Sequence, residues 1–182
     1  QRLQMAWMAK QAPDLWFCKI MKPPKADDDE WNELVQDVEK HFPGLTETEY
    51  FCQEEERTDV SDQLRYKFQV CVDGHTCPWS RLPWQMKSNS VVFKIKNPQD
   101  NFVEWFYPLL DPSKHFLEVE THHLMEAFQH MVHEPDHQLE ISNNASEFVD
   151  KYLSSDLSKR ILLYTLLLLN QKQNVELEDE GQ

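Results

Sequence analysis

The spacing of apolar residues along the chain changes between the period of a helix and the period of a strand. In residues 2–11 the apolar side chains recur at helical spacing, and Pro13 closes the segment. In residues 64–73 apolar side chains alternate with polar ones, which predicts a strand that ends at the Asp73-Gly74 turn. The first part of the chain therefore combines both kinds of element.

The same patterns predict the remaining elements. Apolar runs predict strands at 15–20, 90–95 and 116–119, whereas the polar, acidic segment 47–62 is typical of an exposed loop. Helical spacing predicts helices at 27–41, 80–87, 102–110, 124–132, 139–153 and 157–169, and the leucine-rich residues 161–169 predict burial of the last one. Strands that alternate with helices favour an α/β fold with a doubly wound parallel sheet, closed by the final helices. We expect one lobe over residues 1–173 and an acidic disordered tail over 174–182.

Composition and charge narrow the function classes. The chain has 182 residues, of which 40% are hydrophobic, enough for the core of one domain or of one lobe of a larger enzyme. Its formal net charge of −14 argues against a nucleic-acid partner, because such a field repels phosphate backbones. The longest apolar stretch, 161–169, is about half of the roughly 20 residues that cross a bilayer, so we expect no membrane span. No signal peptide is recognisable at the start.

Positive charge gathers in one segment of this acidic chain. Residues 74–99 contain Arg81, Lys87, Lys94 and Lys96 and no acidic residue. The segment follows a predicted strand and leads into a predicted helix, the place where open α/β sheets bind phosphorylated ligands. A guanidinium such as that of Arg81 can direct two donors at a diphosphate. Four ordinary solvated cations are the competing interpretation, and charge pattern alone leaves both open.

Several short motifs follow one another in a fixed order along the chain. They are 66–74 (YKFQVCVDG), 80–84 (SRLPW), 88–94 (SNSVVFK), 104–110 (EWFYPLL), His115-Phe116 with Val119, and 141–153. Together they resemble the C-terminal lobe of glycosyltransferase family 90. This family contains the Rumi-like protein O-glucosyltransferases and the fungal capsule xylosyltransferases. The resemblance covers most of the chain from Arg2 to about Leu169. His123 departs from it, since many members carry an Asp there.

The resemblance implies a fold, a reaction and a set of donor-binding residues. The fold would be the Rossmann-like C-terminal lobe of a two-lobed, GT-B type glycosyltransferase. The reaction would be an inverting O-transfer from UDP-glucose or UDP-xylose to a protein or glycan acceptor, without a metal or other cofactor. Arg81 and Arg2 would bind the donor diphosphate, and guanidinium donors would stabilise the charge that develops on UDP as the sugar leaves. Weaker candidates for donor contacts are Asp73, Trp79, Ser90, Lys94 and Glu104.

The resemblance also implies that the acceptor site and the general base lie outside these residues. In relatives the acceptor site and the aspartate that acts as general base belong to an upstream N-terminal lobe. We therefore expect no catalytic residue in these 182 residues and no turnover by them alone, although they would still bind the donor. The alternative is a non-catalytic nucleotide-sugar-binding or protein-interaction module derived from the same fold. Family resemblance would place a eukaryotic member in the lumen of the endoplasmic reticulum or Golgi, and another member in the cytoplasm.

Other chemistry has little support in the sequence. There is no Gly-x-Ser-x-Gly elbow, no P-loop and no Gly-x-Gly-x-x-Gly motif, so hydrolase, kinase-like and dinucleotide-binding functions are not indicated. His130, His133 and His137 lie near helical spacing, with His122 and His123 close by, a pattern that suits zinc. Because Pro135 interrupts the helix between them, we assign these histidines to the surface and expect no metal. The four cysteines are too few for a disulfide scaffold, and their pairing stays open.

Overall fold

The computed structural model describes residues 2–12, 14, 16–18, 20–21, 28–44, 46, 51–52, 58–73, 78, 80–96 and 103–179. Its centre is a three-stranded parallel sheet of β3 (Phe68–Cys71), β4 (Val91–Ile95) and β5 (Leu117–Val119), in the order β3-β4-β5. The register pairs Phe68 with Val91 and Phe93 with Leu117. Since all three strands are parallel, their carboxyl ends meet at one edge of the sheet.

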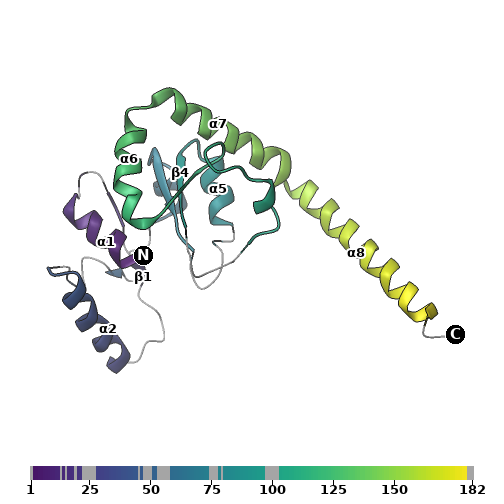
Figure 1. The fold of residues 1–182 in the computed structure, drawn as a ribbon, viewed down its shortest axis with the longest axis horizontal. Helices are drawn as coiled ribbons and strands as arrows, with labels where there is room; N and C mark the ends of the chain where they lie inside the picture. The colour runs from purple at the N-terminus through teal and green to yellow at the C-terminus, as the bar shows by residue number, and fades with distance from the viewer. Residues whose placement is uncertain are drawn as a thin grey trace.

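Helices cover both faces of this sheet (Figure 1). On one face α1 (Arg2–Gln11) and α6 (Leu124–Val132) pack against β3 and β4, with Met5, Phe93 and Leu124 in a common cluster. On the other face α5 (Arg81–Lys87) and α7 (Pro135–Tyr152) enclose Leu82, Val92 and Phe148. Every residue of β4 is buried, which a central strand covered on both faces requires.

The sequence predictions for this core are largely confirmed. The α/β class, the parallel sheet and the flanking helices all appear, and the strands expected at 64–73, 90–95 and 116–119 become β3, β4 and β5. The helix expected at 2–11 has those bounds, and the one expected at 27–41 is α2 (Asp28–His41). The expected interruption at Pro135 is also present: α6 ends at Val132 and α7 begins at the proline, which has no hydrogen bond to lose in the first helical turn.

Four local predictions are wrong. In its described residues, 16–18 and 20, the strand expected at 15–20 is limited to the start of β1 (Ile20–Met21), which pairs with β2 (Phe51–Cys52) in a separate two-stranded parallel sheet. Trp16 is instead held by packing, since its ring centroid lies 4.8 Å from that of Phe128. The expected loop 47–62 contains β2 and the start of α4 (Val60–Gln63). The expected helix 102–110 is reduced, in its described part, to the 3-10 helix η2 (Tyr107–Leu109), because Pro108 cannot sit inside a longer helix.

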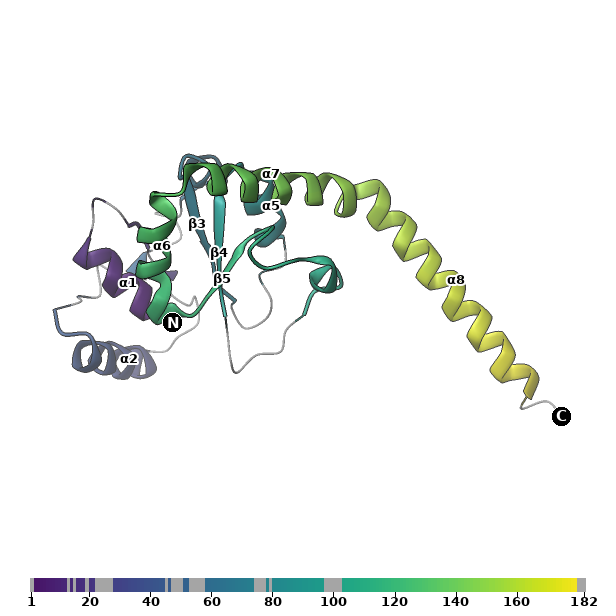
Figure 2. The same cartoon turned by 45° about the horizontal axis from the view of Figure 1, so that its top comes forward.

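The fourth error concerns the final helix. α8 (Ser155–Asp179) projects away from the body in both views (Figures 1 and 2), and it takes in residues 174–179 of the expected tail. Its apolar residues are exposed rather than buried: Leu162 and Leu163 are each 60% exposed and Tyr164 is 64% exposed. Helical spacing predicted the element correctly but could not show that nothing in the described chain covers it. None of the described helices is long and apolar enough to span a membrane.

Candidate nucleotide-sugar site

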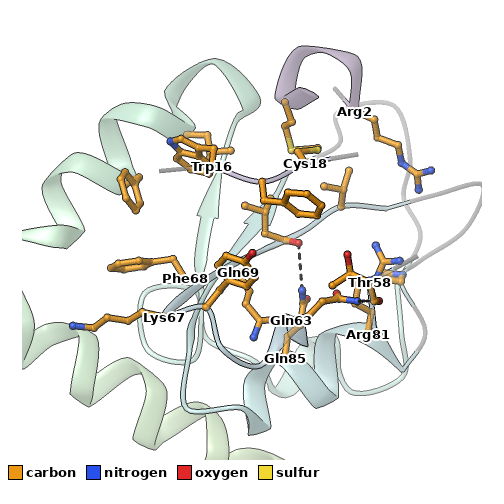
Figure 3. A pocket seen from close by; sticks show the side chains of 18 of the residues that line it. Arg2, Trp16, Cys18, Thr58, Gln63, Lys67, Phe68, Gln69, Arg81 and Gln85 are labelled. Carbon is orange, nitrogen blue, oxygen red and sulfur yellow. Dashed lines mark hydrogen bonds between the residues drawn. The ribbon is translucent and has the colours of Figure 1, made fainter. Parts of the chain in front are cut away.

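A cavity of about 690 Å³ lies along β3, between that strand, α1, residues 16–18 and the start of α5. Its volume falls within the range of small-molecule binding sites. Figure 3 shows Arg2 from α1 and Arg81 from α5 on the same side of this cavity. Two residues that are 79 positions apart in the sequence (81 − 2) are thus brought to one wall by the packing of α1 on the sheet.

The charges around the cavity have one sign. The described residues that line it include the cations Arg2, Lys67 and Arg81, and none of them is an aspartate or a glutamate. In a chain whose net charge is −14, this concentrates positive potential at one hollow. Within the described part of the chain the guanidinium of Arg81 has no ion-pair partner. The arrangement suits an anionic ligand.

Asp73 joins three elements next to the cavity. Lys94 in β4 donates a hydrogen bond to the Asp73 carboxylate, with 2.7 Å between Nζ and Oδ1, and the two side chains are only 10% and 6% exposed. The guanidinium of Arg2 donates to the backbone oxygen of Asp73 at 3.2 Å. Asp73 follows β3, so it lies at the carboxyl edge of the sheet, where α/β proteins bind ligands. One residue therefore links α1, β3 and β4 at this edge.

The cysteines near this edge are protonated thiols. Burial raises the pKa of Cys71 to about 12, although Lys94 and Arg81 act in the opposite direction. Burial likewise raises the pKa of Cys18 to about 11, against the positive charge of Arg2. Both thiols are free in the structure. Neither thiol is therefore a ready nucleophile at neutral pH, because the thiolate is the reactive form.

The structure places the predicted donor residues in different surroundings. It brings Arg2, Asp73 and Lys94 into direct contact and puts Arg81 on the same cavity wall as Arg2. Lys94 is occupied by the Asp73 carboxylate. Glu104 is half-buried in the turn before η2 and is not among the described lining residues. Trp79 lies outside the described residues.

Ser90 lies at the amino-terminal end of β4, away from the edge that carries Asp73. Its hydroxyl donates to the Tyr66 carbonyl at 2.7 Å and lies 3.0 Å from the Gln69 amide nitrogen. The residue is almost fully buried. These bonds give Ser90 a role in joining β3 to β4, and its assignment as a donor contact stays a prediction.

Sequence reasoning missed some of the residues that line the cavity. Lys67 adds a third cation, and Phe17 and Tyr66 offer aromatic faces that are 59% and 49% exposed. Trp84 is half-buried and also lines the cavity. Alternation in residues 64–73 signals a strand but does not indicate which strand edge borders a hollow. That information depends on how α1 and residues 16–18 pack.

Comparison with known proteins decides the family. The model of glycosyl transferase family 90 matches residues 2–175, nearly the whole chain. The chain belongs to this family. Among curated proteins no significant match is found. Membership of family 90 confirms the resemblance, and the three-stranded parallel sheet flanked by helices is consistent with a Rossmann-like glycosyltransferase lobe.

Proposed function

We propose that this chain is the donor-binding half of an inverting O-glycosyltransferase that uses UDP-glucose or UDP-xylose. The observation that carries the proposal is the cavity beside β3, which is lined by Arg2, Lys67 and Arg81 and by no described carboxylate. A UDP-sugar is a dianion at its diphosphate, and family 90 consists of glycosyltransferases. The exposed aromatic faces of Phe17 and Tyr66 at the same cavity suit a nucleobase.

The proposed chemistry lies on the leaving-group side. As the bond between the sugar and the diphosphate breaks, negative charge develops on the β-phosphate of UDP. Arg81 and Arg2 stabilise that charge more strongly in the transition state than in the bound donor, which lowers the barrier. Arg2 is held for this role by its bond to the Asp73 carbonyl, and the Asp73–Lys94 pair fixes that carbonyl in turn. No metal is needed for this step.

The acceptor side belongs to a second lobe in this proposal. An inverting transfer needs a base that takes the acceptor's proton, and the described cavity lining contains no aspartate, glutamate or histidine to serve as one. The exposed leucines of α8 provide a surface that a second body of the enzyme can cover. The acceptor, a protein or a glycan, would then be held between the two lobes.

Calorimetric titration with UDP tests the donor site. Arg81→Ala removes a charge-assisted pair with the diphosphate, and we expect a loss of about 2 kcal/mol, which is roughly a 30-fold weaker Kd. Arg81→Lys keeps the charge without the planar fork and should fall between the two. Arg160→Ala is the matched control, because Arg160 lies exposed on α8 and pairs with Asp156. Equal UDP affinity in Arg81→Ala and the native chain would refute the site.

A transfer assay tests the division between lobes. We expect no sugar transfer from UDP-glucose or UDP-xylose by the 182 residues, and transfer when an upstream lobe of the family is supplied. Robust transfer by the 182 residues, lost in Glu104→Gln or His115→Ala, would show that the base lies in this chain. UDP binding with no transfer under either condition would favour the non-catalytic binding module instead.

A further inference from the structure

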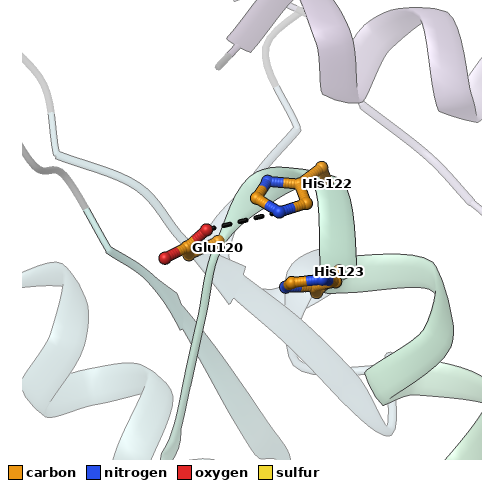
Figure 4. Close-up of side chains that lie close together, drawn as sticks. All are labelled: Glu120, His122 and His123. Carbon is orange, nitrogen blue, oxygen red and sulfur yellow. Dashed lines mark ion pairs between the residues drawn. The ribbon is translucent and has the colours of Figure 1, made fainter.

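Three side chains with metal-binding chemistry lie together where β5 leads into α6. Glu120 is the first residue after β5, and His122 and His123 belong to the 3-10 helix η3 (Thr121–His123) that precedes α6. Figure 4 shows the carboxylate and the two imidazole rings gathered at this turn. The two rings have centroids 4.0 Å apart. The tight turn brings the side chains together because only a single residue separates Glu120 from His122.

The distances suit a shared ion. His122 Nε2 lies 3.3 Å from Glu120 Oε2, and one ligand atom of each of the three residues lies within 4.8 Å of the others. Around a tetrahedral zinc ion with bonds of about 2.0–2.1 Å, neighbouring ligand atoms are about 3.4 Å apart. The first pair already has this spacing. His123 is exposed, and we expect its ring to rotate toward an ion that the other two residues bind.

The ligand types select the metal. Two imidazole nitrogens and one carboxylate oxygen are ligands for zinc and similar borderline divalent ions, whereas magnesium and calcium prefer sites made of oxygen alone. Three protein ligands leave one tetrahedral position for water. The strongly acidic chain adds a favourable long-range field for a divalent cation.

No other group of described residues offers the same arrangement. Across the part of the chain that the structure describes, no second set of three histidine, cysteine, aspartate or glutamate side chains brings its ligand atoms this close together. Of the histidines that the sequence raised for zinc, His130, His133 and His137 are not brought into such a group in the described part of the chain, whereas His122 and His123 are. The free thiols Cys18 and Cys71 are not part of such a group either.

We propose that Glu120, His122 and His123 form a zinc-binding site that fixes the turn between β5 and α6. Leu124, the first residue of α6, is buried against the sheet, so an ion at this turn would hold the start of a helix that also packs on α1. The three ligands of this site are not among the described residues that line the donor cavity, although the neighbouring Leu124 is. UDP affinity measured without zinc tests the proposed function on its own, because that proposal uses guanidinium groups and no metal.

Titration of the purified, metal-free chain with zinc chloride in a calorimeter tests the proposal. We expect one binding event that is absent with magnesium chloride. His122→Ala and His123→Ala should each weaken zinc binding by about tenfold or more, and Glu120→Gln should also weaken it, because each removes one of three ligands. His133→Ala is the matched control, since His133 is an exposed histidine outside the cluster, and it should bind zinc like the native chain.

A second measurement separates a site from loose surface binding. A ligand that binds the folded state raises the melting temperature, so zinc should raise it for the native chain and for His133→Ala and not for the three cluster variants. Circular dichroism without zinc checks that these exposed substitutions leave the fold intact. The proposal is overturned if the native chain binds no zinc, or if both His122→Ala and His123→Ala keep the native affinity and the native shift.

Discussion

The Lys94–Asp73 pair should contribute far more to stability than a second pair with the same chemistry. Two lysine–aspartate contacts among the described residues have nearly equal lengths, 2.7 Å for Lys94–Asp73 and 2.6 Å for Lys87–Asp150. Their surroundings differ: the side chains of the first are 10% and 6% exposed, and those of the second are 45% and 66% exposed. A comparison of Lys94→Met with Lys87→Met therefore isolates the effect of burial.

The expected magnitudes follow from that difference. Lys94→Met leaves the buried Asp73 carboxylate without its ammonium partner, which costs about 3–5 kcal/mol of the free energy of unfolding. Lys87→Met removes an exposed pair and costs about 0.2–1 kcal/mol. For a chain of this size 1 kcal/mol corresponds to roughly 2–4 °C, so Lys94→Met should lower the melting temperature by about 10 °C and Lys87→Met by about 3 °C or less.

Urea denaturation of both variants measures the two free energies directly. The double variant Lys94→Met, Asp73→Asn should recover part of the loss, because it removes both charges instead of leaving one of them buried and unpaired. If Lys94→Met destabilised the chain no more than Lys87→Met, the buried pair would not be the support of the sheet edge that the geometry indicates. The placement of Arg2 through Asp73 would then need another cause.

Two further predictions concern other parts of the chain. Burial, assisted by the positive charge of Lys114, lowers the pKa of His115 from its ordinary 6.5, so the unfolded chain binds the proton more readily than the folded one. The free energy of unfolding should therefore fall as the pH drops below 6.5. Urea denaturation of His115→Gln should show a flatter pH dependence than that of the native chain. Leu163→Ser and Leu167→Ser, at positions 60% and 52% exposed, should each change the free energy of unfolding by less than about 0.5 kcal/mol. Leu82→Ala in the core should cost about 2–5 kcal/mol, and equal losses at positions 82 and 163 would show that α8 is packed in solution.

Much of the fold follows from patterns that the sequence carries locally. Apolar residues alternate with polar ones around Phe68, and they recur at helical spacing in residues 2–11. Each pattern indicates which side of its element is buried, and both elements form as predicted. The errors arise where a single element does not decide the outcome. The leucines of 161–169 predict a helix that needs cover, but whether the described chain provides the cover is a property of the whole structure. Pro108 is a local signal that predicts a shorter helix than the one expected at 102–110.

The candidate site was predictable only in part, for a similar reason. The position of Arg81 after β3 and at the start of α5 follows from the order of the elements. Ser90 and Lys94 are four residues apart along one extended segment, about 13 Å, so strand geometry alone places them at opposite ends of β4. The contact between Arg2 and Asp73 had no local signal, because it depends on how α1 packs against the sheet.

The number of residues between the partners of each contact favours an order in which the two contacts form during folding. Lys94 reaches Asp73 across 21 residues, whereas Arg2 reaches the same residue across 71. Closing the longer loop costs about 1 kcal/mol more chain entropy, since this cost grows with the logarithm of loop length. The β3–α5–β4 unit can therefore collapse with its ion pair in place while α1 is still undocked. The cavity gains its second arginine only when α1 docks, so we expect the proposed diphosphate site to be completed late in folding.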